Sequence, residues 1–520
     1  MQVRDYNTPC VGRDERVQSR ASWEAFANRL RRHVRFACGL LPDLPRAPLR
    51  ALRVPAYRGE GFRIERWALE TLPGYYLTGS LFIPETPAGR RAPAMLQPHG
   101  HFEHGRLNPP DILRAIALAQ AGAWVLMYDM VGYNDHFQLA HKPNETEAWH
   151  RWGFSVAGLQ TWNSLCAFEW LARQPEVDAK RIGCSGISGG GTQTFLLAAV
   201  EPRLACAAPV KMVSTTMQGG CLCENPPLLR LFACNPEIAA LCAPRPMLLI
   251  SDSGDWTADN PEKVAPFLRR VYELYGVPER FQHAHMQEGH EFGQESRAVY
   301  YRWCAQTLGL RQIPRDPTIE PESLLPALRV WGEDLPRPKE APEGEAVFEQ
   351  YRAQVEAALP RWLRNRAAKQ EMRQALLSMV GLENLPRMPK PRLRATACII
   401  VAHETNVPRI AERLPALDML KVTPPRRLAP HESLSAYFAT YNLKPLAQQA
   451  RALLEEVQKL LTEGLRVRLF ADPSGAPIVA IVAALTGVPC QFEPPESPVD
   501  LPGWERIGGM EALRRVFRIG

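Results

Sequence analysis

Residues 181–200 read RIGCSGISGGGTQTFLLAAV, a short apolar segment that runs into glycines and then into a second apolar segment. Within it, Gly186-Ile187-Ser188-Gly189-Gly190 fits G-x-S-x-G, a pattern in which a sharp strand-to-helix turn exposes a nucleophilic serine. Glycine is expected on both sides because the tight turn leaves no room for a Cβ. Ser185 does not fit, since Ile187 stands where its second glycine should be. The pattern therefore predicts Ser188 as a nucleophile.

The alternative for this segment is a glycine-rich turn that binds phosphate. The pattern G-x-x-x-x-G-K-[ST] is absent because no lysine directly follows the glycines, and no G-x-G-x-x-G follows a first strand. The sequence context favours the catalytic serine.

The rest of the chain predicts an α/β protein with more than one domain, as its 520 residues also suggest. Short apolar runs alternate with helical periods from about residue 60 to 312, which indicates a mostly parallel sheet with helices on both faces. We predict a helical extension at 1–55, an α/β-hydrolase catalytic domain at 56–312, a proline-rich linker and helical segment at 313–394, and a smaller α/β lobe at 395–520.

A serine nucleophile needs a base, and the base needs an acid that fixes its tautomer. In this fold the acid and then the histidine follow the serine along the chain. Three aspartates follow the strand PMLLIS and three histidines lie near the end of the domain: Asp252, Asp255, Asp259, His283, His285 and His290. Strand alternation places His283 and His285 within a strand, whereas His290 follows Gly289 in a loop. We predict His290 as the base and Asp255 as its partner; Asp252, at the strand end, is the alternative.

The tetrahedral intermediate of acyl transfer needs two hydrogen-bond donors. The backbone N–H of Gly189, directly after the nucleophile, is the first candidate. The loop LQPHGHFEHGR follows an early strand, and there the N–H of His101 is the predicted second donor.

Two groups of residues invite a metal or redox interpretation. His99, His101 and His104 lie close together in sequence, but no carboxylate or cysteine pair stands at ligand spacing, so a hydrogen-bonded loop is predicted. Cys221 and Cys223 form C-x-C rather than C-x-x-C, and packed thiols are predicted. The sequence thus predicts no metal and no cofactor.

Composition limits the partners and the compartment. The formal net charge is only +7, and no Lys/Arg run is interleaved with aromatic residues, so a nucleic-acid partner is not expected. No run of 18 apolar residues and no apolar leader are present, so we expect no membrane partner and a cytoplasmic location, or secretion after removal of a leader. The 12 cysteines are expected to be reduced.

Segments between about residues 20 and 312 resemble the acetyl xylan esterase-like bacterial α/β-hydrolases. The matching segments include LPGYYLTGSLFIP, PHGHFEHGR, YDMVGYND, GISGGGTQTFLLAAV, GGCLCENPPLLR, SDSGDWT and EGHEFGQESR. The resemblance implies a triad of Ser188, Asp255 and His290, ester hydrolysis often directed at acetylated carbohydrate, and no cofactor. It also makes Glu224 a candidate substrate-binding residue, with a structural salt bridge as the alternative. Trp149 and Trp152 are either core residues or pocket residues.

Longer members of that family carry two hydrolase-like halves, and the region after 395 resembles a shortened second half. At its turn stands Ala471-Asp472-Pro473-Ser474-Gly475, which lacks the first glycine. We predict an inactive lobe that packs on the first or forms a homo-oligomer contact. The predicted function is a serine carboxylesterase for short-chain, mainly acetyl, esters of small molecules or carbohydrates. The alternatives are a serine peptidase of the same fold and a non-catalytic binding or scaffold protein.

Overall fold

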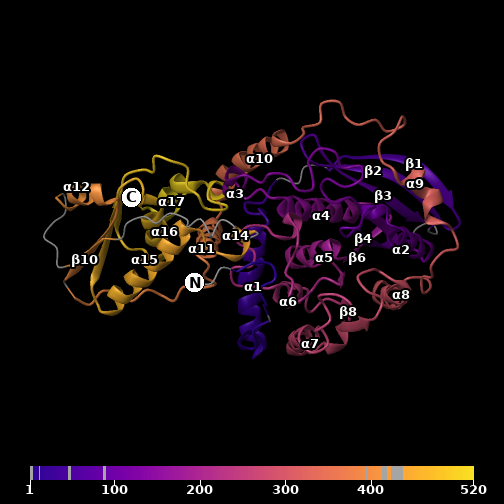
Figure 1. Cartoon of the computed structure of the whole chain (residues 1–520), viewed down its shortest axis with the longest axis horizontal. Coiled ribbons are helices and arrows are strands. Elements are labelled where there is room, and N and C mark those ends of the chain that lie inside the picture. Colours follow the sequence, from indigo (N-terminus) through magenta and orange to yellow (C-terminus); the bar gives the residue numbers. More distant parts are fainter. Residues whose placement is uncertain are drawn as a thin grey trace.

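The computed structural model describes residues 4–10, 12–44, 49–85, 90–393, 395–412, 419–422 and 437–519. Residues 1–3 of the predicted N-terminal extension and residue 394 at the end of the predicted linker lie outside this set. The described chain forms two sheets side by side, each with its own helices (Figure 1). None of the helices in the described ranges combines the length and hydropathy that a membrane-spanning helix needs.

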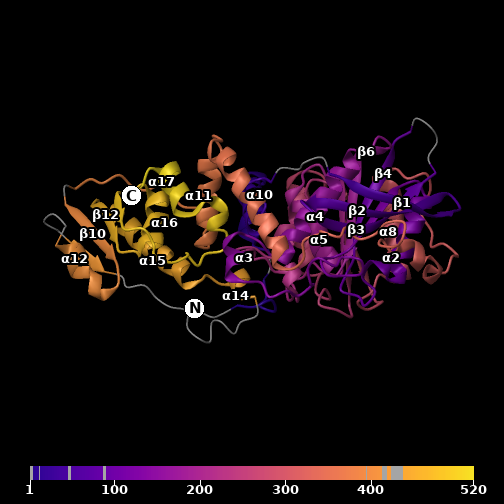
Figure 2. The ribbon, with the colours of Figure 1, turned by 90° about the horizontal axis from the view of Figure 1, so that it is seen from above.

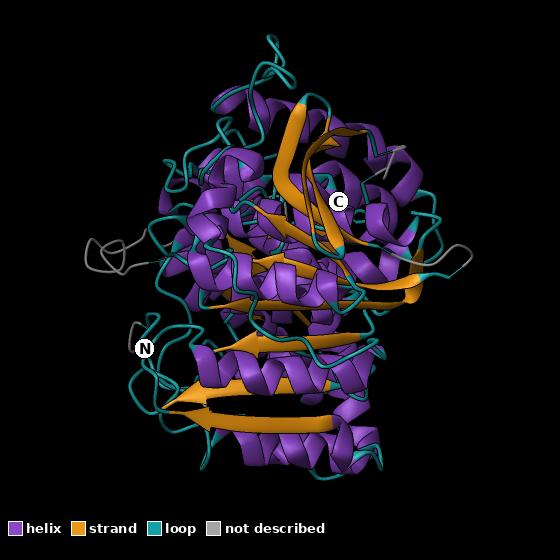
Figure 3. Ribbon diagram, turned by 90° about the vertical axis from the view of Figure 1, so that its right-hand side faces the viewer, coloured by secondary structure: helices purple, strands orange, loops and turns teal. Residues whose placement is uncertain are grey.

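The larger sheet has nine strands in the order β1-β2-β3-β5-β4-β6-β7-β8-β9. The strands from β5 to β9 along this order are parallel, and β1, β2 and β3 form an antiparallel edge. Figure 3 shows the strong twist of the sheet. Its strands are β1 (Ala51–Gly59), β2 (Phe62–Leu72), β3 (Tyr75–Pro84), β4 (Ala92–Pro98), β5 (Trp124–Tyr128), β6 (Val177–Ile187), β7 (Cys206–Val210), β8 (Met247–Asp252) and β9 (Phe281–Met286). The predicted class, a mostly parallel α/β-hydrolase sheet, is confirmed.

Helices cover both faces of this sheet, because alternate strand residues point to opposite sides. Leu96 and Leu126 belong to the core under one layer of helices, whereas Met95 and Val125 belong to the core on the other face. The first layer contains α1 (Arg20–Ala37), α4 (Val156–Ala172), α5 (Gly189–Val200), α6 (Asn235–Ala240) and α7 (Val264–Leu274). The second contains α2 (Pro109–Gln120) and α8 (Gln294–Leu308), with the short α9 (Leu325–Leu328).

Local sequence signals explain several helix ends. Helix α1 begins after Ser19, whose side chain exchanges hydrogen bonds with Ser22 in a capping box. Helix α2 begins at a Pro-Pro pair, where the missing N–H groups cost nothing. Helix α8 ends at Gly309, which adopts a left-handed conformation.

The smaller sheet has four parallel strands in the order β11-β10-β12-β13. Its strands are β10 (Thr396–Val401), β11 (Met419–Val422), β12 (Arg466–Ala471) and β13 (Cys490–Phe492). The α-helices that the structure describes after residue 400 are α12 (Val407–Ala411), α14 (Phe438–Tyr441), α15 (Pro445–Thr462), α16 (Ala476–Thr486) and α17 (Gly509–Phe517). Two further helices, α10 (Glu345–Leu363) and α11 (Ala368–Met379), lie where the two parts meet (Figure 2). The helical part of the segment predicted at 313–394 thus contains two long helices with a break between them.

A buried helix connects the part of the chain around the larger sheet with the part around the smaller sheet. Helix α1 packs against both α5 and α11. Its fully buried His33 bonds Ser378 of α11 through Nδ1, at 3.0 Å, and the carbonyl oxygens of Leu228 and Leu229 through Nε2. The first N-terminal helix therefore belongs to the cores of both parts.

A second joint forms between the loop after β7 and the segment around α14. Leu228 N–H donates to the carbonyl of Ala439 at 2.7 Å, and Arg230 N–H to that of Thr440 at 3.0 Å. Tyr437 also donates its hydroxyl to the carbonyl of Gly220. The C-terminal part thus pairs its backbone with a loop of the larger sheet.

Candidate active site

Ser188 occupies the turn between β6 and α5 with a strained backbone. Its φ of 56° and ψ of −125° are rare for a residue with a side chain, and such a conformation costs on the order of 1–3 kcal/mol. A Cβ at Gly186 would lie 2.4 Å from the carbonyl oxygen of Pro98, and one at Gly190 would lie 2.5 Å from the same atom. The two glycines are therefore required by the close approach of the loop after β4.

Asp255 and His290 form a hydrogen-bonded pair at the same edge of the sheet. His290 Nδ1 lies 2.8 Å from Asp255 Oδ2, and the side chain of Asp255 is 2% exposed. The other carboxylate oxygen accepts hydrogen bonds from both the N–H and the hydroxyl of Thr257. The carboxylate is thereby fixed with one oxygen facing the imidazole.

The opposite nitrogen of His290 is buried and has no hydrogen-bond partner within the described ranges. The ring lies between Trp256, at a centroid distance of 4.2 Å, and Phe102. No hydrogen bond joins His290 to Ser188 in the described residues. In unliganded enzymes such catalytic hydrogen bonds are often long and shorten only when substrate binds.

Asp252 has different partners. Its Oδ2 lies 2.8 Å from Lys211 Nζ, and both side chains are fully buried. The N–H groups of Gly254, Glu288 and Gly289 donate to the same carboxylate. Although burial opposes ionisation, the hydrogen bond from Lys211 and these N–H groups lower the pKa of Asp252. Asp252 therefore holds the loop that leads to His290 and does not contact the imidazole.

The side chain of His101 lies close to Gly189, the residue that carries the other predicted oxyanion donor. A Cβ at Gly189 would lie 2.6 Å from Cε1 of His101, so this ring lies over the first turn of α5. Neither the N–H of Gly189 nor that of His101 has an acceptor in the part of the chain that the structure describes. Both N–H groups are thus without a protein acceptor, and their role as oxyanion donors stays a prediction.

The three clustered histidines separate in the structure. His99 is buried, accepts from the N–H of Met130 through Nε2, and has its pKa lowered to about 3 by burial. His104 is exposed. His101 instead turns toward Cys223, with 3.0 Å between Nε2 and Sγ.

His101 is part of a four-residue cluster whose members lie far apart in the sequence. The ligand atoms of His101, His141, Cys221 and Cys223 all lie within 4.8 Å of one another. Hydrogen bonding, first from Cys223 and then from the two imidazoles, lowers the pKa of the Cys221 thiol. The signals for this cluster were the C-x-C pair and two histidines in loops that follow strands, but 80 residues separate His141 from Cys221.

Glu224 and the two tryptophans make hydrogen bonds and core contacts within the fold. Glu224 Oε2 accepts from the N–H groups of Gly220 and Cys221, and Oε1 accepts from the hydroxyl of Thr192, so the carboxylate ties the cysteine loop to α5. Burial raises the pKa of Glu224. It forms no salt bridge with another described residue. A role in substrate binding stays a prediction.

Trp149 lies in α3 (Glu147–Arg151), buried against Phe348 of α10, and its Nε1 donates to Glu345. Trp152 is half-buried beside the same core. In the described residues, no hydrogen bond or ring contact joins either indole to Ser188, Asp255 or His290. Their predicted place in a pocket has no support from these contacts.

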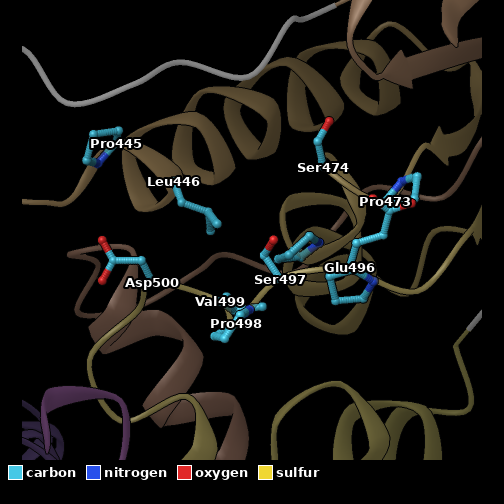
Figure 4. Close-up of a pocket in the computed structure, with 11 residues that line it drawn as sticks. Pro445, Leu446, Pro473, Ser474, Glu496, Ser497, Pro498, Val499 and Asp500 are labelled. Carbon is cyan, nitrogen blue, oxygen red and sulfur yellow. The ribbon is translucent and has the colours of Figure 1, made fainter. Parts of the chain in front are cut away.

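Ser474 of the smaller sheet lies in a turn between β12 and α16 but lacks the features of Ser188. Its φ is not positive, and its hydroxyl donates to Asp472 at 2.6 Å. It borders a cavity of about 570 Å³ in which Figure 4 also labels Ser497 and Asp500. Among the described residues, no histidine or lysine lines this cavity.

The parallel sheet, the strained serine turn and the Asp–His pair define an α/β-hydrolase. No protein-family model matches the chain. The structure of methylesterase BT1017 has 30% sequence identity and a TM-score of 0.57, over 64% of this chain and 75% of its own. The Bacillus subtilis (strain 168) protein named "Putative hydrolase YtaP" is 26% identical over 276 residues, 48% of this chain and 90% of that protein.

By its identity and coverage with the methylesterase, this chain belongs to the esterase-like α/β-hydrolases. A glucuronoyl esterase from Solibacter usitatus is more distant, with 16% identity and a TM-score of 0.44 over 59% of this chain and 99% of its own.

Proposed function

We propose that the protein is a serine carboxylesterase in which Ser188, His290 and Asp255 form the triad. The single observation that supports this most is the fixed Asp255–His290 pair, whose free Nε2 lies at the sheet edge that also carries the strained Ser188 turn. A carboxylate on Nδ1 selects the tautomer in which Nε2 can accept a proton.

The proposed reaction has two halves. The hydroxyl oxygen of Ser188 attacks the ester carbonyl while Nε2 of His290 takes the hydroxyl proton, and the oxyanion is held by the N–H groups of Gly189 and His101. The C–O bond to the alcohol then breaks, and His290 returns the proton to the leaving alcohol. Water, deprotonated by His290, hydrolyses the acyl-enzyme and releases the acid and free Ser188.

Two substrate classes follow from the resemblance and from the relative. The acetyl xylan esterase-like sequence favours a small acyl group, with acetylated carbohydrate as the expected class. The methylesterase relative favours the opposite arrangement, a methyl ester of a larger acid. Acetyl ester hydrolysis is the first proposal and methyl ester hydrolysis the second.

One experiment separates these classes. Wild type and Ser188→Ala are assayed on p-nitrophenyl acetate, butyrate and octanoate, on an acetylated sugar with acetate measured, and on a methyl-esterified uronic acid with methanol measured. Acetate release that disappears in Ser188→Ala supports the first proposal, and methanol release that does so supports the second.

The two alternatives have their own outcomes. Amide cleavage without ester cleavage would indicate the peptidase. Absence of both activities, together with no labelling by a fluorophosphonate probe of the folded protein, would indicate the binding protein and overturn the triad.

A further inference from the structure

Three loops meet beside the serine turn and bring four metal-binding side chains together. His101 follows β4, His141 lies in the loop after β5, and Cys221 and Cys223 lie in the loop after β7. Their ligand atoms lie within 4.8 Å of one another, with both cysteines buried and both histidines half-buried. No other group of three or more such residues occurs in the described residues.

The distances inside the cluster are close to those of a tetrahedral metal site. His101 Nε2 lies 3.0 Å from Cys223 Sγ, and His141 Nε2 lies 3.2 Å from Cys221 Sγ. Four ligands at about 2.0–2.3 Å around Zn²⁺ would be separated by about 3.3–3.8 Å. These two pairs would need to lengthen by well under 1 Å to reach that spacing, and the remaining ligand pairs lie within 4.8 Å.

The contacts around the cluster also fit a ligand set. The other ring nitrogen of His141, Nδ1, lies 2.7 Å from the carbonyl oxygen of Val131, an arrangement that presents an unprotonated Nε2 to the cluster. Metal-binding histidines nearly always have such a partner, because it fixes tautomer and ring orientation.

The cysteine loop is likewise held from outside. Glu224 accepts from the N–H of Cys221 at 3.1 Å, and Asn225 Nδ2 donates to the carbonyl of Cys221 at 2.7 Å. Both sulfur atoms are thereby presented on the same side as the imidazoles. Simple packing of thiols explains Cys184 and Cys206, which lie within the sheet core, but it gives no reason for two imidazoles to face two thiols.

We propose that His101, His141, Cys221 and Cys223 bind one divalent transition-metal ion, with Zn²⁺ the ion that the two-sulfur, two-nitrogen set fits. Four protein ligands leave no position for water or substrate, so the ion is structural. It joins the three loops and fixes the one that carries His101. The role in fixing an oxyanion donor rests on the proposed function, whereas the metal site itself does not.

The first test measures metal content, which does not depend on activity. The full chain is purified under reducing conditions, and its zinc is counted by mass spectrometry before chelation, after chelation and after reloading. We expect about one Zn²⁺ per chain, lost on chelation with a lower melting temperature and regained on reloading. Cobalt in its place should give the thiolate charge-transfer and intense visible bands of a tetrahedral site.

Variants assign the ion to these residues. Cys221→Ser and His141→Ala should bind less than a tenth as much metal as wild type and lose the cobalt spectrum. Cys234→Ser, a buried thiol nearby that faces no imidazole, and His104→Ala, an exposed histidine of the first loop, should bind as wild type does. Circular dichroism shows which variants remain folded. If the ligand variants do not fold, the chelation and reloading of wild type decide whether the chain binds the metal ion.

The results that would overturn the metal site differ from those that would overturn the proposed esterase activity. Reduced, reloaded wild type that binds neither Zn²⁺ nor Co²⁺ overturns the proposal, as do ligand variants that bind metal like wild type. A Cys221–Cys223 disulfide in the protein from reducing purification, seen as a loss of two hydrogens by mass, overturns it as well. Ser188→Ala should keep its metal, so an inactive but metal-bound wild type would count against the esterase and not against the site.

Discussion

Lys211 Nζ lies 2.8 Å from Asp252 Oδ2, and this fully buried ion pair distinguishes two aspartates that stand three residues apart. The ammonium also donates to the carbonyl oxygen of Gly289, at 2.7 Å, directly before the histidine. The carboxylate of Asp252 is occupied by this ion pair, whereas the carboxylate of Asp255 faces the imidazole of His290. The two acids therefore have separable effects on stability and on catalysis.

Asp255→Asn should leave the fold intact and lower kcat by about 10⁴, because an amide beside Nδ1 favours the wrong tautomer of His290. Thermal unfolding and ester hydrolysis of the same preparation check this. Asp252→Asn is the matched control. It should lower the free energy of unfolding by about 3 kcal/mol, because the buried charge on Lys211 loses its nearest carboxylate and keeps only that of Glu288, 3.9 Å away. Activity near wild type in Asp255→Asn would transfer the catalytic role to another acid.

Gly190→Ala should impair activity more than a small side chain ordinarily would. The added Cβ would meet backbone oxygen atoms of Pro98 and His99 at 2.5 and 2.8 Å, and overpacking of this kind costs about 1–3 kcal/mol. The loop carrying the His101 N–H must move, so we expect at least a tenfold loss in kcat. Gly220→Ala, where a Cβ meets nothing within 4 Å, is the control. Equal activity of the two variants would contradict the close approach.

Stability should fall as the pH falls below about 6.5. Burial lowers the pKa of His33 to about 4, so the unfolded chain takes up a proton that the folded chain refuses. Between pH 6.5 and 4 this group alone removes up to about 3 kcal/mol, and above pH 6.5 it removes nothing. Burial of His99 and His136 acts in the same direction. Urea unfolding at pH 7.5 and 5 measures the effect.

His33→Gln isolates its share of this pH dependence. The variant should lose less stability than wild type between pH 7.5 and 5, because one buried titrating group is gone. His104→Gln, on the surface, should follow the wild-type curve. A His33→Gln curve parallel to wild type would mean that His33 is not responsible.

Ser474→Ala should leave ester hydrolysis within twofold of wild type. No described histidine or lysine lines the cavity that it borders, and its hydroxyl already donates to Asp472. The assay used for Ser188→Ala serves here too. A large loss of activity with an unchanged melting temperature would show that the smaller sheet takes part in the reaction.

The serine turn was predictable because its cause is local: the two glycines and the apolar segments around Ser188 stand within a few residues. The order of Ser188, Asp255 and His290 followed from the fold, since successive parallel strands end at one edge. The antiparallel strands β1 and β2 were not predicted, and the predicted boundary at 55/56 falls within β1. In β2 the adjacent charges of Glu65 and Arg66 break the alternation that begins at Phe62.

Other features depend on contacts between distant residues. Nothing near Lys211 in the sequence shows that its charge is buried against Asp252. The cluster of His101, His141 and Cys221 spans 120 residues and appears only when three loops are placed together. In the sequence, His101 is grouped with its neighbours His99 and His104. In the fold, the side chain of His99 is buried against Met130 and that of His104 is exposed, so neither joins the cluster.

The backbone pairing of Leu228 and Arg230 with Ala439 and Thr440 limits how the chain can be divided. A gene fragment that ends at residue 312 would keep every triad residue yet leave unpaired amides on the loop that carries Cys221. The halves are not interchangeable modules, and heat should melt them in one cooperative transition.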